Sequence, residues 1–499
     1  MLNAELKEIS KHLENIAIKE DRIKFNLYMN KSFLKGLEKI ERKRSEYYMN
    51  VVGPFLQKYE KQMFNTEPNI ADMITYLRNK YNTYLHFQQP ELASIAEKIF
   101  QNSMNFEFFL NNKKVNFDSI ATHIETNRDP KMRKLAWNNF LILGERNKEL
   151  YFHLFFLRKK AAHKLGFPDL YQWSIAQRQI QDISVPVKII AKVVRNKIEK
   201  LLYERFNIKM SHLHPWDLKY YCLLSSSKAN EIFRQRVKTK QFKNILEKVI
   251  NKSGYNLNEL NINFYKAQIP YDGLCIGTYS KKADILFNPR GSFESLTYLF
   301  HEFGHAFHTV RQKSNCYLSA EAEDNFFYEG VAYCFEKIAV NQEFIEEELG
   351  LQKRDALALL QQAKFRQLFD ILSILIRLEF EKKIYKYDIN LNEIDKVYAD
   401  IYKDFTGIEH PPNAYWASPV YFARDMFTVL DYLLAENVVE QTMPAIYRHP
   451  YYKNYLDIVP LVDKYYVSQT LNWNKKIKNL TGSYLTPKFL IKEVKSENK

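Results

Sequence analysis

Glycine and proline are scarce in this 499-residue sequence, which contains 13 glycines and 16 prolines. Both residues interrupt helices and build tight turns, so their scarcity favours long helices over many short elements joined by turns. Hydrophobic residues make up 46% of the chain and aromatic residues 15%, which is enough apolar surface for a large core. We therefore expect a mostly α-helical protein.

Cysteines are also few, and they are widely spaced. The four cysteines form no CxxC pair, which argues against both a disulfide framework and a thiolate zinc site. The first twenty residues contain no apolar signal core, and no apolar run approaches the roughly 18 residues that a membrane-spanning helix requires. We expect a soluble cytoplasmic protein with no membrane partner.

A long basic run is missing as well, although the formal net charge is +15 and the pI is about 9.2. The lysines and arginines are spread along the chain among 58 acidic residues, and no nucleic-acid-binding motif is evident. This distribution favours a solvated basic surface, so we predict no nucleic-acid partner.

One five-residue stretch carries a recognisable metal-binding pattern: His301-Glu302-Phe303-Gly304-His305. Residues four apart lie on the same face of a helix, so His301 and His305 can each place a ring nitrogen on one metal ion. Glu302 lies about 100° around the helix, where its carboxylate can act as a base on a metal-activated water. Ser292 is a suitable helix N-cap, and apolar residues at helical spacing around the histidines predict that the helix is buried.

A catalytic zinc site normally has three protein ligands and one open position. In the metzincin pattern the third ligand would be a histidine at position 311, but this chain has Arg311 there. A glutamate from a second helix is the alternative, and residues 324–340 predict such a helix, with Glu329 among apolar residues. A carboxylate is costly to bury in such surroundings unless a cation or hydrogen bonds satisfy it.

Other histidines and acids near this pattern have less specific explanations. We expect His308 to be a hydrogen-bonded core residue, although it lies two turns from His301. Glu336 lies on the same helical face as Glu329 and could orient His301 through its second ring nitrogen. The pair His212 and His214 could bind a metal elsewhere, but we interpret it as part of a loop.

The run HEFGHAFH, followed by a helical glutamate at 329, resembles the thimet oligopeptidase and oligoendopeptidase F family of zinc peptidases. The resemblance implies that His301, His305 and Glu329 bind one Zn²⁺ per chain and that Glu302 is the general base. It also implies a two-lobed helical zincin metallopeptidase fold with a small β-sheet beside the active-site helix and a deep central cleft. The segments 277–280 and 283–288 resemble the family's strand beside that cleft.

A peptidase also needs hydrogen-bond donors for the oxyanion that forms when water attacks a peptide carbonyl. The resembled family places histidine and tyrosine donors in the region that corresponds to residues 410–432. Carried over, Tyr421 is the first candidate, followed by His410 and Tyr415, which match its H-x4-Y spacing. The chain departs from the family at Pro419-Val420, where a proline–histidine pair would be expected.

Helical patterns recur along the N-terminal part of the chain. They predict helices over residues 4–18, 21–50, 52–64 and 69–81. Gly166-Phe167-Pro168-Asp169 is a signal that ends one helix and begins another, and a further helix is predicted from about residue 186 toward residue 206. Beyond the motif, residues 354–386 predict a long scaffold helix. We predict an N-terminal helical lobe over residues 1–190 and a catalytic zincin-like peptidase region over 191–499.

The sequence thus predicts a zinc metallo-endopeptidase that hydrolyses short oligopeptides. Two alternatives remain. One is a zinc peptidase of the dipeptidyl carboxypeptidase type, because those enzymes share the HExGH helix and a glutamate at a similar offset. The other is a catalytically weak, peptide-binding relative that retains the metal, as the altered Pro419-Val420 region suggests. The oligomeric state and the cleavage preference do not follow from the sequence.

Overall fold

A computed structural model describes residues 2–30, 34–59, 67–115, 117–180, 186–223, 228–267, 269, 272–278, 281–314, 316–424, 426–469 and 472–495. Most of these residues lie in helices, which confirms the prediction of a mostly helical protein. Across these ranges, no helix is both long enough and apolar enough to cross a membrane.

The chain divides into two compact units, each built from separate segments. Unit 1 comprises Met1–His86, Ile232–Ala356 and Leu434–Leu485, and unit 2 comprises Phe87–Glu231, Leu357–Leu433 and Thr486–Lys499. These units are groups of residues in mutual contact, so the predicted boundary near residue 190 stays a prediction. Each unit is described by itself below.

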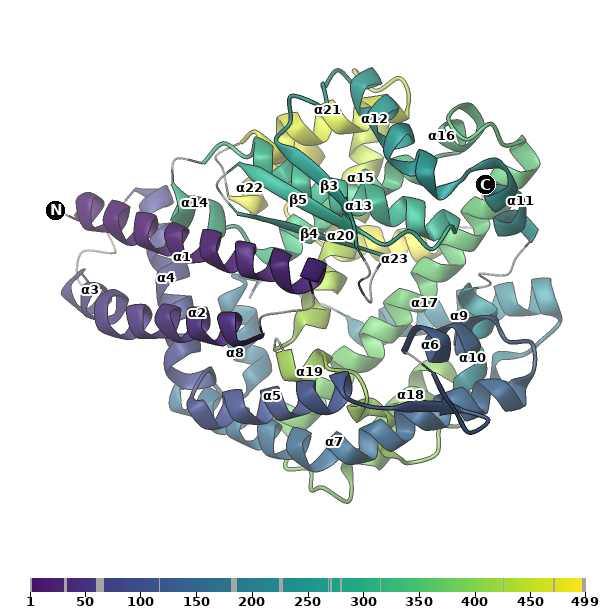
Figure 1. The fold of residues 1–499 in the computed structure, drawn as a ribbon, viewed down its shortest axis with the longest axis horizontal. Helices are drawn as coiled ribbons and strands as arrows, with labels where there is room; N and C mark the ends of the chain where they lie inside the picture. The colour runs from purple at the N-terminus through teal and green to yellow at the C-terminus, as the bar shows by residue number, and fades with distance from the viewer. Residues whose placement is uncertain are drawn as a thin grey trace. The chain divides into compact units, whose positions relative to one another are not determined.

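The helices of unit 1 come from all three of its segments (Figure 1). They are α1 (Leu2–Asn30), α2 (Leu34–Tyr47), α3 (Gly53–Tyr59), α4 (Pro68–Phe87), α11 (Lys228–Arg236), α12 (Phe242–Lys252), α13 (Phe293–Arg311), α14 (Tyr317–Glu321), α15 (Asn325–Ala339), α16 (Gln342–Glu347), α21 (Ile458–Val462) and α22 (Trp473–Thr481). Two π-helical segments, η1 (Tyr48–Val52) and η7 (Asp463–Val467), and the 3-10 turns η4 (Thr239–Gln241) and η6 (Tyr455–Asp457) complete it. Four helices have residues in both units: α4, α11, α17 (Lys353–Lys386) and α20 (Thr428–Tyr447).

A three-stranded sheet lies beside α13 in unit 1 (Figure 1). Its order is β3 (Ile262–Lys266), β5 (Lys282–Phe287), β4 (Gly273–Thr278), with β5 parallel to β3 and antiparallel to β4. The predicted strand over 283–288 is therefore present as β5, and the predicted 277–280 segment coincides with β4 as far as residue 278. Residues 279 and 280 lie outside the described residues.

Side chains on the two faces of this sheet meet different helices. Ile276 and Leu286 belong to an apolar cluster that α1 supplements with Phe25, Tyr28 and Met29. α13 packs against both β4 and β5. In the order β3-β5-β4, β4 is an edge strand, and it packs against the motif helix α13.

Unit 2 is built around the long helix α7 (Pro130–Lys164). Its other elements are α5 (Pro90–Met104), the hairpin of β1 (Phe108–Leu110) and β2 (Lys113–Val115), α6 (Phe117–Thr126), α8 (Leu170–Gln177), α9 (Val187–Phe206), η3 (Met210–His212), α10 (Pro215–Leu223), α18 (Ile394–Thr406), η5 (Ala414–Ala417), α19 (Tyr421–Arg424) and α23 (Lys488–Lys495).

The segment from η5 to α19 lies along one face of α7. A Cβ atom at Gly144 would overlap the carbonyl oxygen of Ala414, so only glycine permits this close approach. Further along the same face, the Tyr151 hydroxyl donates to the Pro419 carbonyl at 2.7 Å. Arg158 then donates to the carbonyl oxygens of Phe422 and Ala423. Buried side chains of α7 therefore fix the backbone that carries Tyr421.

Candidate metal centre

The motif helix α13 begins where the sequence predicts. The Ser292 hydroxyl accepts a hydrogen bond from the Ser295 N–H at 3.2 Å, and Glu294 lies in the first turn. The helix is buried along most of its length, including both motif histidines. At Gly304 an added Cβ would lie 2.7 Å from the Cα of Ala332 on α15. Glycine at this position thus allows the backbones of α13 and α15 to approach closely.

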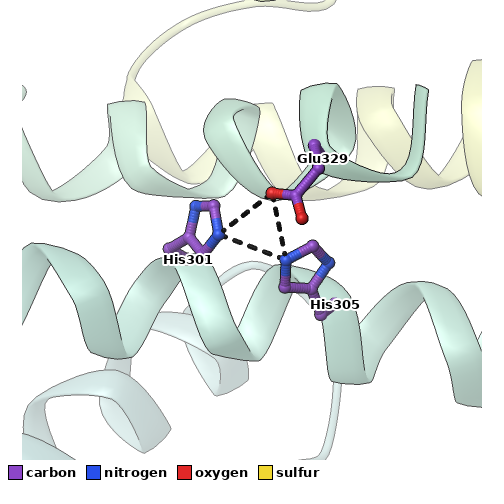
Figure 2. A group of neighbouring side chains, drawn as sticks. All are labelled: His301, His305 and Glu329. Atoms are coloured by element: carbon purple, nitrogen blue, oxygen red, sulfur yellow. Dashed lines mark hydrogen bonds and ion pairs between the residues drawn. The ribbon is translucent and has the colours of Figure 1, made fainter. Parts of the chain in front are cut away.

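This close approach brings the three predicted ligands together. The Nε2 atoms of His301 and His305 are 3.1 Å apart. One carboxylate oxygen of Glu329, Oε2, lies 3.5 Å from each of them. Figure 2 shows the two imidazoles on α13 turned toward this oxygen on α15. In the part of the chain that the structure describes, these residues form the only group of three with metal-ligand spacing.

The spacing of these three atoms can be compared with that of a zinc site. Zinc ligands lie about 2.0–2.2 Å from the metal, so neighbouring ligand atoms in a tetrahedral site are about 3.3 Å apart. The observed separations of 3.1, 3.5 and 3.5 Å define a triangle whose circumscribed circle has a radius of about 2.0 Å. An ion slightly outside the plane of the triangle would be at bonding distance from all three atoms. The residues therefore fit zinc.

The charges of the triad also favour a cation between its members. Burial alone lowers the pKa of His301, but its contacts with the Glu329 and Glu336 carboxylates outweigh burial and raise this pKa to about 10. Burial raises the pKa of Glu329, yet His305 and His301 together bring it far below the usual range. The two carboxylates thus stabilise a positive charge at His301, and a metal cation bound between the three residues would supply that charge in place of the proton.

Glu302, the predicted base, is held by the edge strand β4. Its Oε2 accepts a hydrogen bond from the Cys275 N–H at 2.7 Å. A Cβ atom at Gly273 would lie 2.6 Å from the Glu302 Cγ, so glycine at this position makes room for the side chain. No pattern in the sequence links Gly273 or Cys275 to Glu302, because their contact depends on how the sheet packs against α13.

Of the neighbouring residues, Glu336 lies beside the triad, whereas His308 lies beside a different acid. Glu336 Oε2 lies 3.6 Å from His301 Nδ1, which is the side of the ring that faces away from the triad. This distance suits an ion pair but is longer than a hydrogen bond, so the orienting role of Glu336 stays a prediction. His308 is buried and lies 2.9 Å from Glu323 Oε2 rather than in the triad. Its predicted place in the core is therefore confirmed.

The three predicted oxyanion donors all lie in unit 2. Tyr421 is 44% exposed, and the Arg377 guanidinium lies 4.4 Å from the centre of its ring. Tyr415 is half-buried and stacks on Trp137. The rings of His410 and Tyr415 lie 6.2 Å apart, so the structure brings these two together. Their roles as donors stay predictions.

The protonation of His410 bears on that role. Burial lowers its pKa to about 4, so the imidazole is neutral at pH 7. Its Nδ1 lies 2.8 Å from the Pro411 carbonyl oxygen, which can only accept, so Nδ1 carries the single proton of the neutral ring. Nε2 is then an acceptor. This tautomer makes the tyrosine hydroxyls better suited than His410 to donate to an oxyanion.

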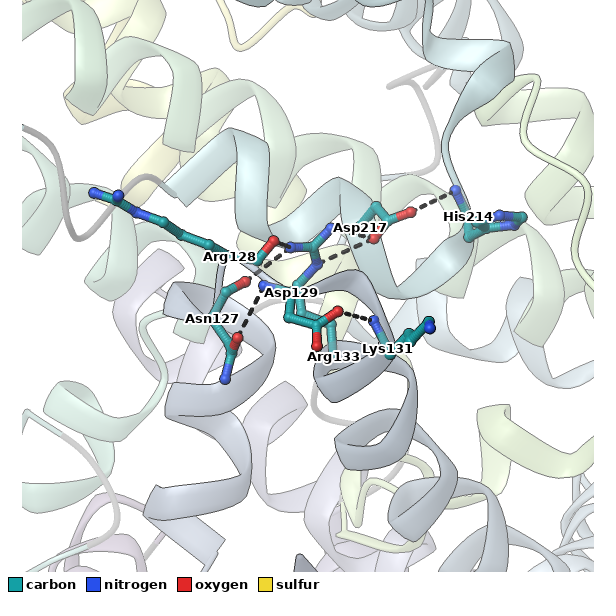
Figure 3. A network of polar contacts seen from close by, with 7 residues as sticks. All are labelled: Asn127, Arg128, Asp129, Lys131, Arg133, His214 and Asp217. Carbon is teal, nitrogen blue, oxygen red and sulfur yellow. Dashed lines mark hydrogen bonds and ion pairs between the residues drawn. The ribbon is translucent and has the colours of Figure 1, made fainter. Parts of the chain in front are cut away.

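The second histidine pair lies in unit 2, where His214 belongs to a network of polar contacts (Figure 3). The His214 N–H donates to Asp217 Oδ2 at 3.1 Å at the start of α10, and its ring stacks on Trp216. Asp217 Oδ1 accepts from Arg133 Nε and Nη2 at 3.0 and 2.6 Å. Neither His212 nor His214 belongs to a group with metal-ligand spacing within the described ranges.

Sequence reasoning missed two aromatic residues of α15 that lie against the predicted ligand histidines. Tyr328 stacks on His305, with ring centres 4.3 Å apart, and Tyr333 lies against His301 at 5.2 Å. Tyr328 directly precedes Glu329 and Tyr333 follows it by four residues, so the predicted third ligand and both aromatic neighbours come from one helix.

No protein-family model matches the chain, and a search of curated proteins finds no match. We therefore infer the function from the residues and geometry of this chain.

Proposed function

We propose that the protein is a zinc-dependent metallo-endopeptidase that hydrolyses peptide bonds in short oligopeptides. The observation that supports this most directly is the arrangement of His301 Nε2, His305 Nε2 and Glu329 Oε2, whose separations fit three corners of a tetrahedral zinc site. The resemblance of HEFGHAFH, which contains both histidines, to the thimet oligopeptidase and oligoendopeptidase F motif also supports the proposal.

Zinc bound by three protein ligands keeps one position for water and lowers the pKa of that water to about 7. Glu302 is the proposed general base, which takes a proton from the attacking water and passes it to the leaving amine. The hydrogen bond from Cys275 to Glu302 fixes the direction of the carboxylate, so the base does not have to be ordered during the reaction.

A neutral hydroxyl is the proposed donor to the tetrahedral oxyanion. Tyr421 is the first candidate because its side chain is 44% exposed and its backbone is fixed by Tyr151 and Arg158. Tyr415 and His410 are further candidates, although the tautomer of His410 leaves Nε2 without a proton to donate.

The same proposal includes the properties of the resembled family. These are a two-lobed helical zincin fold around a deep cleft and a size limit that excludes folded proteins. The proposed location in the cytoplasm follows from the cysteine pattern and the first twenty residues. Short peptides are the proposed partners, without nucleic acid or membrane.

A cleavage assay tests the proposal. The zinc-loaded protein and a Glu302→Gln variant with equal zinc content would be incubated with a mixed library of short peptides, and the products identified by mass spectrometry. Loss of general-base catalysis is expected to slow cleavage by about 10²–10⁴-fold. Equal background rates in both proteins would contradict an enzymatic function.

A second arm of the assay uses the same peptides with amidated C-termini. An endopeptidase cuts them as well as the free acids. Cleavage restricted to free C-termini would indicate an enzyme of the dipeptidyl carboxypeptidase type. Zinc and peptide binding without any cleavage would indicate the catalytically weak, peptide-binding relative that the Pro419-Val420 departure suggests.

A further inference from the structure

Tyr328 contacts one ligand histidine in two ways. Its ring stacks on the His305 imidazole, with ring centres 4.3 Å apart and an angle of 25° between the planes. Its hydroxyl donates to the His305 carbonyl oxygen at 3.2 Å and lies 3.2 Å from the Thr309 hydroxyl. The same side chain therefore contacts both the ring and the backbone of His305.

Tyr328 also contacts a second histidine of the same helix. The His308 ring lies 5.2 Å from the Tyr328 ring, one turn beyond His305 on α13. His308 in turn lies 2.9 Å from Glu323, whose other carboxylate oxygen is 2.5 Å from the Lys476 ammonium. The side chains of His308, Glu323 and Lys476 are largely buried, so this second neighbour of Tyr328 is itself held by a buried polar chain.

His305 needs such support more than His301 does. A metal-binding imidazole is normally oriented by a hydrogen bond to its second nitrogen. His301 has the Glu336 carboxylate 3.6 Å from its Nδ1. Among the residues whose placement is described, neither buried Nδ1 has a hydrogen-bond partner, and only that of His301 has a carboxylate at ion-pair distance. The orientation of this ring must therefore come from packing.

We propose that Tyr328 is the positioning residue of the metal centre, holding the His305 ring by stacking and fixing α15 against α13 one residue before the ligand Glu329. This inference rests on the proposed function, because it assumes that the triad binds zinc. The contacts of the Tyr328 hydroxyl to His305 and Thr309 direct it to α13, which separates Tyr328 from the tyrosines proposed as oxyanion donors.

The test compares three variants in zinc affinity, measured by competition with a chromogenic chelator, and in the visible absorption spectrum of the Co²⁺-substituted protein. Tyr328→Leu removes the stack and the hydroxyl. Tyr328→Phe removes only the hydroxyl. Tyr255→Leu is the matched control, because Tyr255 also packs edge-on against α13, at Phe307, and donates to Asp463 without touching the triad.

We expect Tyr328→Leu to lower zinc affinity by about 10- to 100-fold and to change the Co²⁺ spectrum, as the loss of an orienting partner does. Tyr328→Phe should keep the spectrum and weaken zinc binding by about two- to tenfold, as the loss of one hydrogen bond does. Tyr255→Leu should leave both measurements unchanged, although its thermal stability falls.

A Tyr328→Leu variant with wild-type affinity and spectrum would overturn the inference while the proposed function stands. Equal losses in Tyr328→Leu and Tyr255→Leu would overturn it too, because the effect would then follow stability alone. If the leucine variant does not fold, an unchanged zinc affinity in Tyr328→Phe overturns it. A wild-type protein that binds neither zinc nor cobalt would contradict the proposed function itself.

Discussion

Gly304→Ala should separate α13 and α15, the two helices that carry the proposed zinc ligands. The added Cβ would lie 2.7 Å from the Cα of Ala332 and 3.1 Å from the Cβ of Phe335. Carbon atoms in contact prefer about 3.5–4.0 Å, so α13 and α15 must move apart by roughly 1 Å. The backbone of Ala332 cannot rotate out of the way. We therefore expect a destabilisation of about 1–3 kcal/mol, as is typical of an overpacked core.

The same movement should weaken metal binding. Metal–ligand distances tolerate a deviation of only about 0.2 Å. A shift of about 1 Å of Glu329 away from the histidines would take its carboxylate out of bonding range, so zinc affinity should fall by more than tenfold. Zinc titration by chelator competition and thermal unfolding in the presence of a chelator would measure the two effects separately.

Gly144→Ala provides the control for this experiment. Its Cβ would overlap the Ala414 carbonyl oxygen, so it should destabilise the protein at least as strongly. Its contacts lie in unit 2 and none involves the triad, so zinc affinity should be retained. The reasoning would be refuted if Gly304→Ala bound zinc normally, or if both variants lost zinc binding equally.

Three further predictions concern unit 2. Tyr421→Phe should lower kcat by about 10²–10³-fold with little change in KM if Tyr421 donates to the oxyanion, and steady-state kinetics on one cleaved peptide would show an unchanged kcat if it does not. Burial raises the pKa of Glu381 to about 7 despite the Phe427 N–H and the charges of Arg158, Arg178 and Arg377. The folded state therefore binds this proton more tightly than the unfolded state, so stability should fall by about 3 kcal/mol as the pH rises from about 4.5 to 7, and urea unfolding of Glu381→Gln should lack this decline. Asp217→Ala leaves the buried Arg133 without its carboxylate and should cost about 3–5 kcal/mol in chemical denaturation while zinc content stays the same; a cost below about 1 kcal/mol would contradict a buried ion pair.

Local signals in the sequence predicted several elements well. Ser292 begins α13 as expected, and the predicted scaffold helix over 354–386 differs by one residue from α17. The stop at Gly166-Phe167-Pro168-Asp169 is present, since α7 ends at Lys164 and Asp169 caps α8. These features depend on caps and helix-breaking residues, which act over a few positions.

Other boundaries were wrong because such signals were weak. The sequence predicted a break after residue 18, but α1 continues to Asn30, and the predicted helix over 21–50 is divided between α1 and α2. No glycine or proline occurs between residues 19 and 34, the stretch in which α1 ends and α2 begins. Amphipathic patterns of neighbouring helices run together in such a stretch, and tertiary packing decides where each one ends.

The candidate site, too, was predicted in part by local signals and depends in part on tertiary packing. Helical spacing alone predicted that His301 and His305 share a face, and apolar surroundings singled out Glu329. The supporting contacts of Cys275 and Tyr328 could not be predicted, because they arise where a strand edge and a second helix meet α13. Gly304 indicated such a meeting only once the partner helix was known.

The number of zinc ions per chain tests the central claim most directly. The protein and three variants, His305→Ala, Glu329→Ala and the control Glu381→Gln, would be dialysed against buffered nanomolar zinc and measured by elemental mass spectrometry. The coordination geometry predicts one zinc per chain in the wild type and in Glu381→Gln, and almost none in the two ligand variants. Equal zinc content in all four proteins, or none in the wild type, would contradict it.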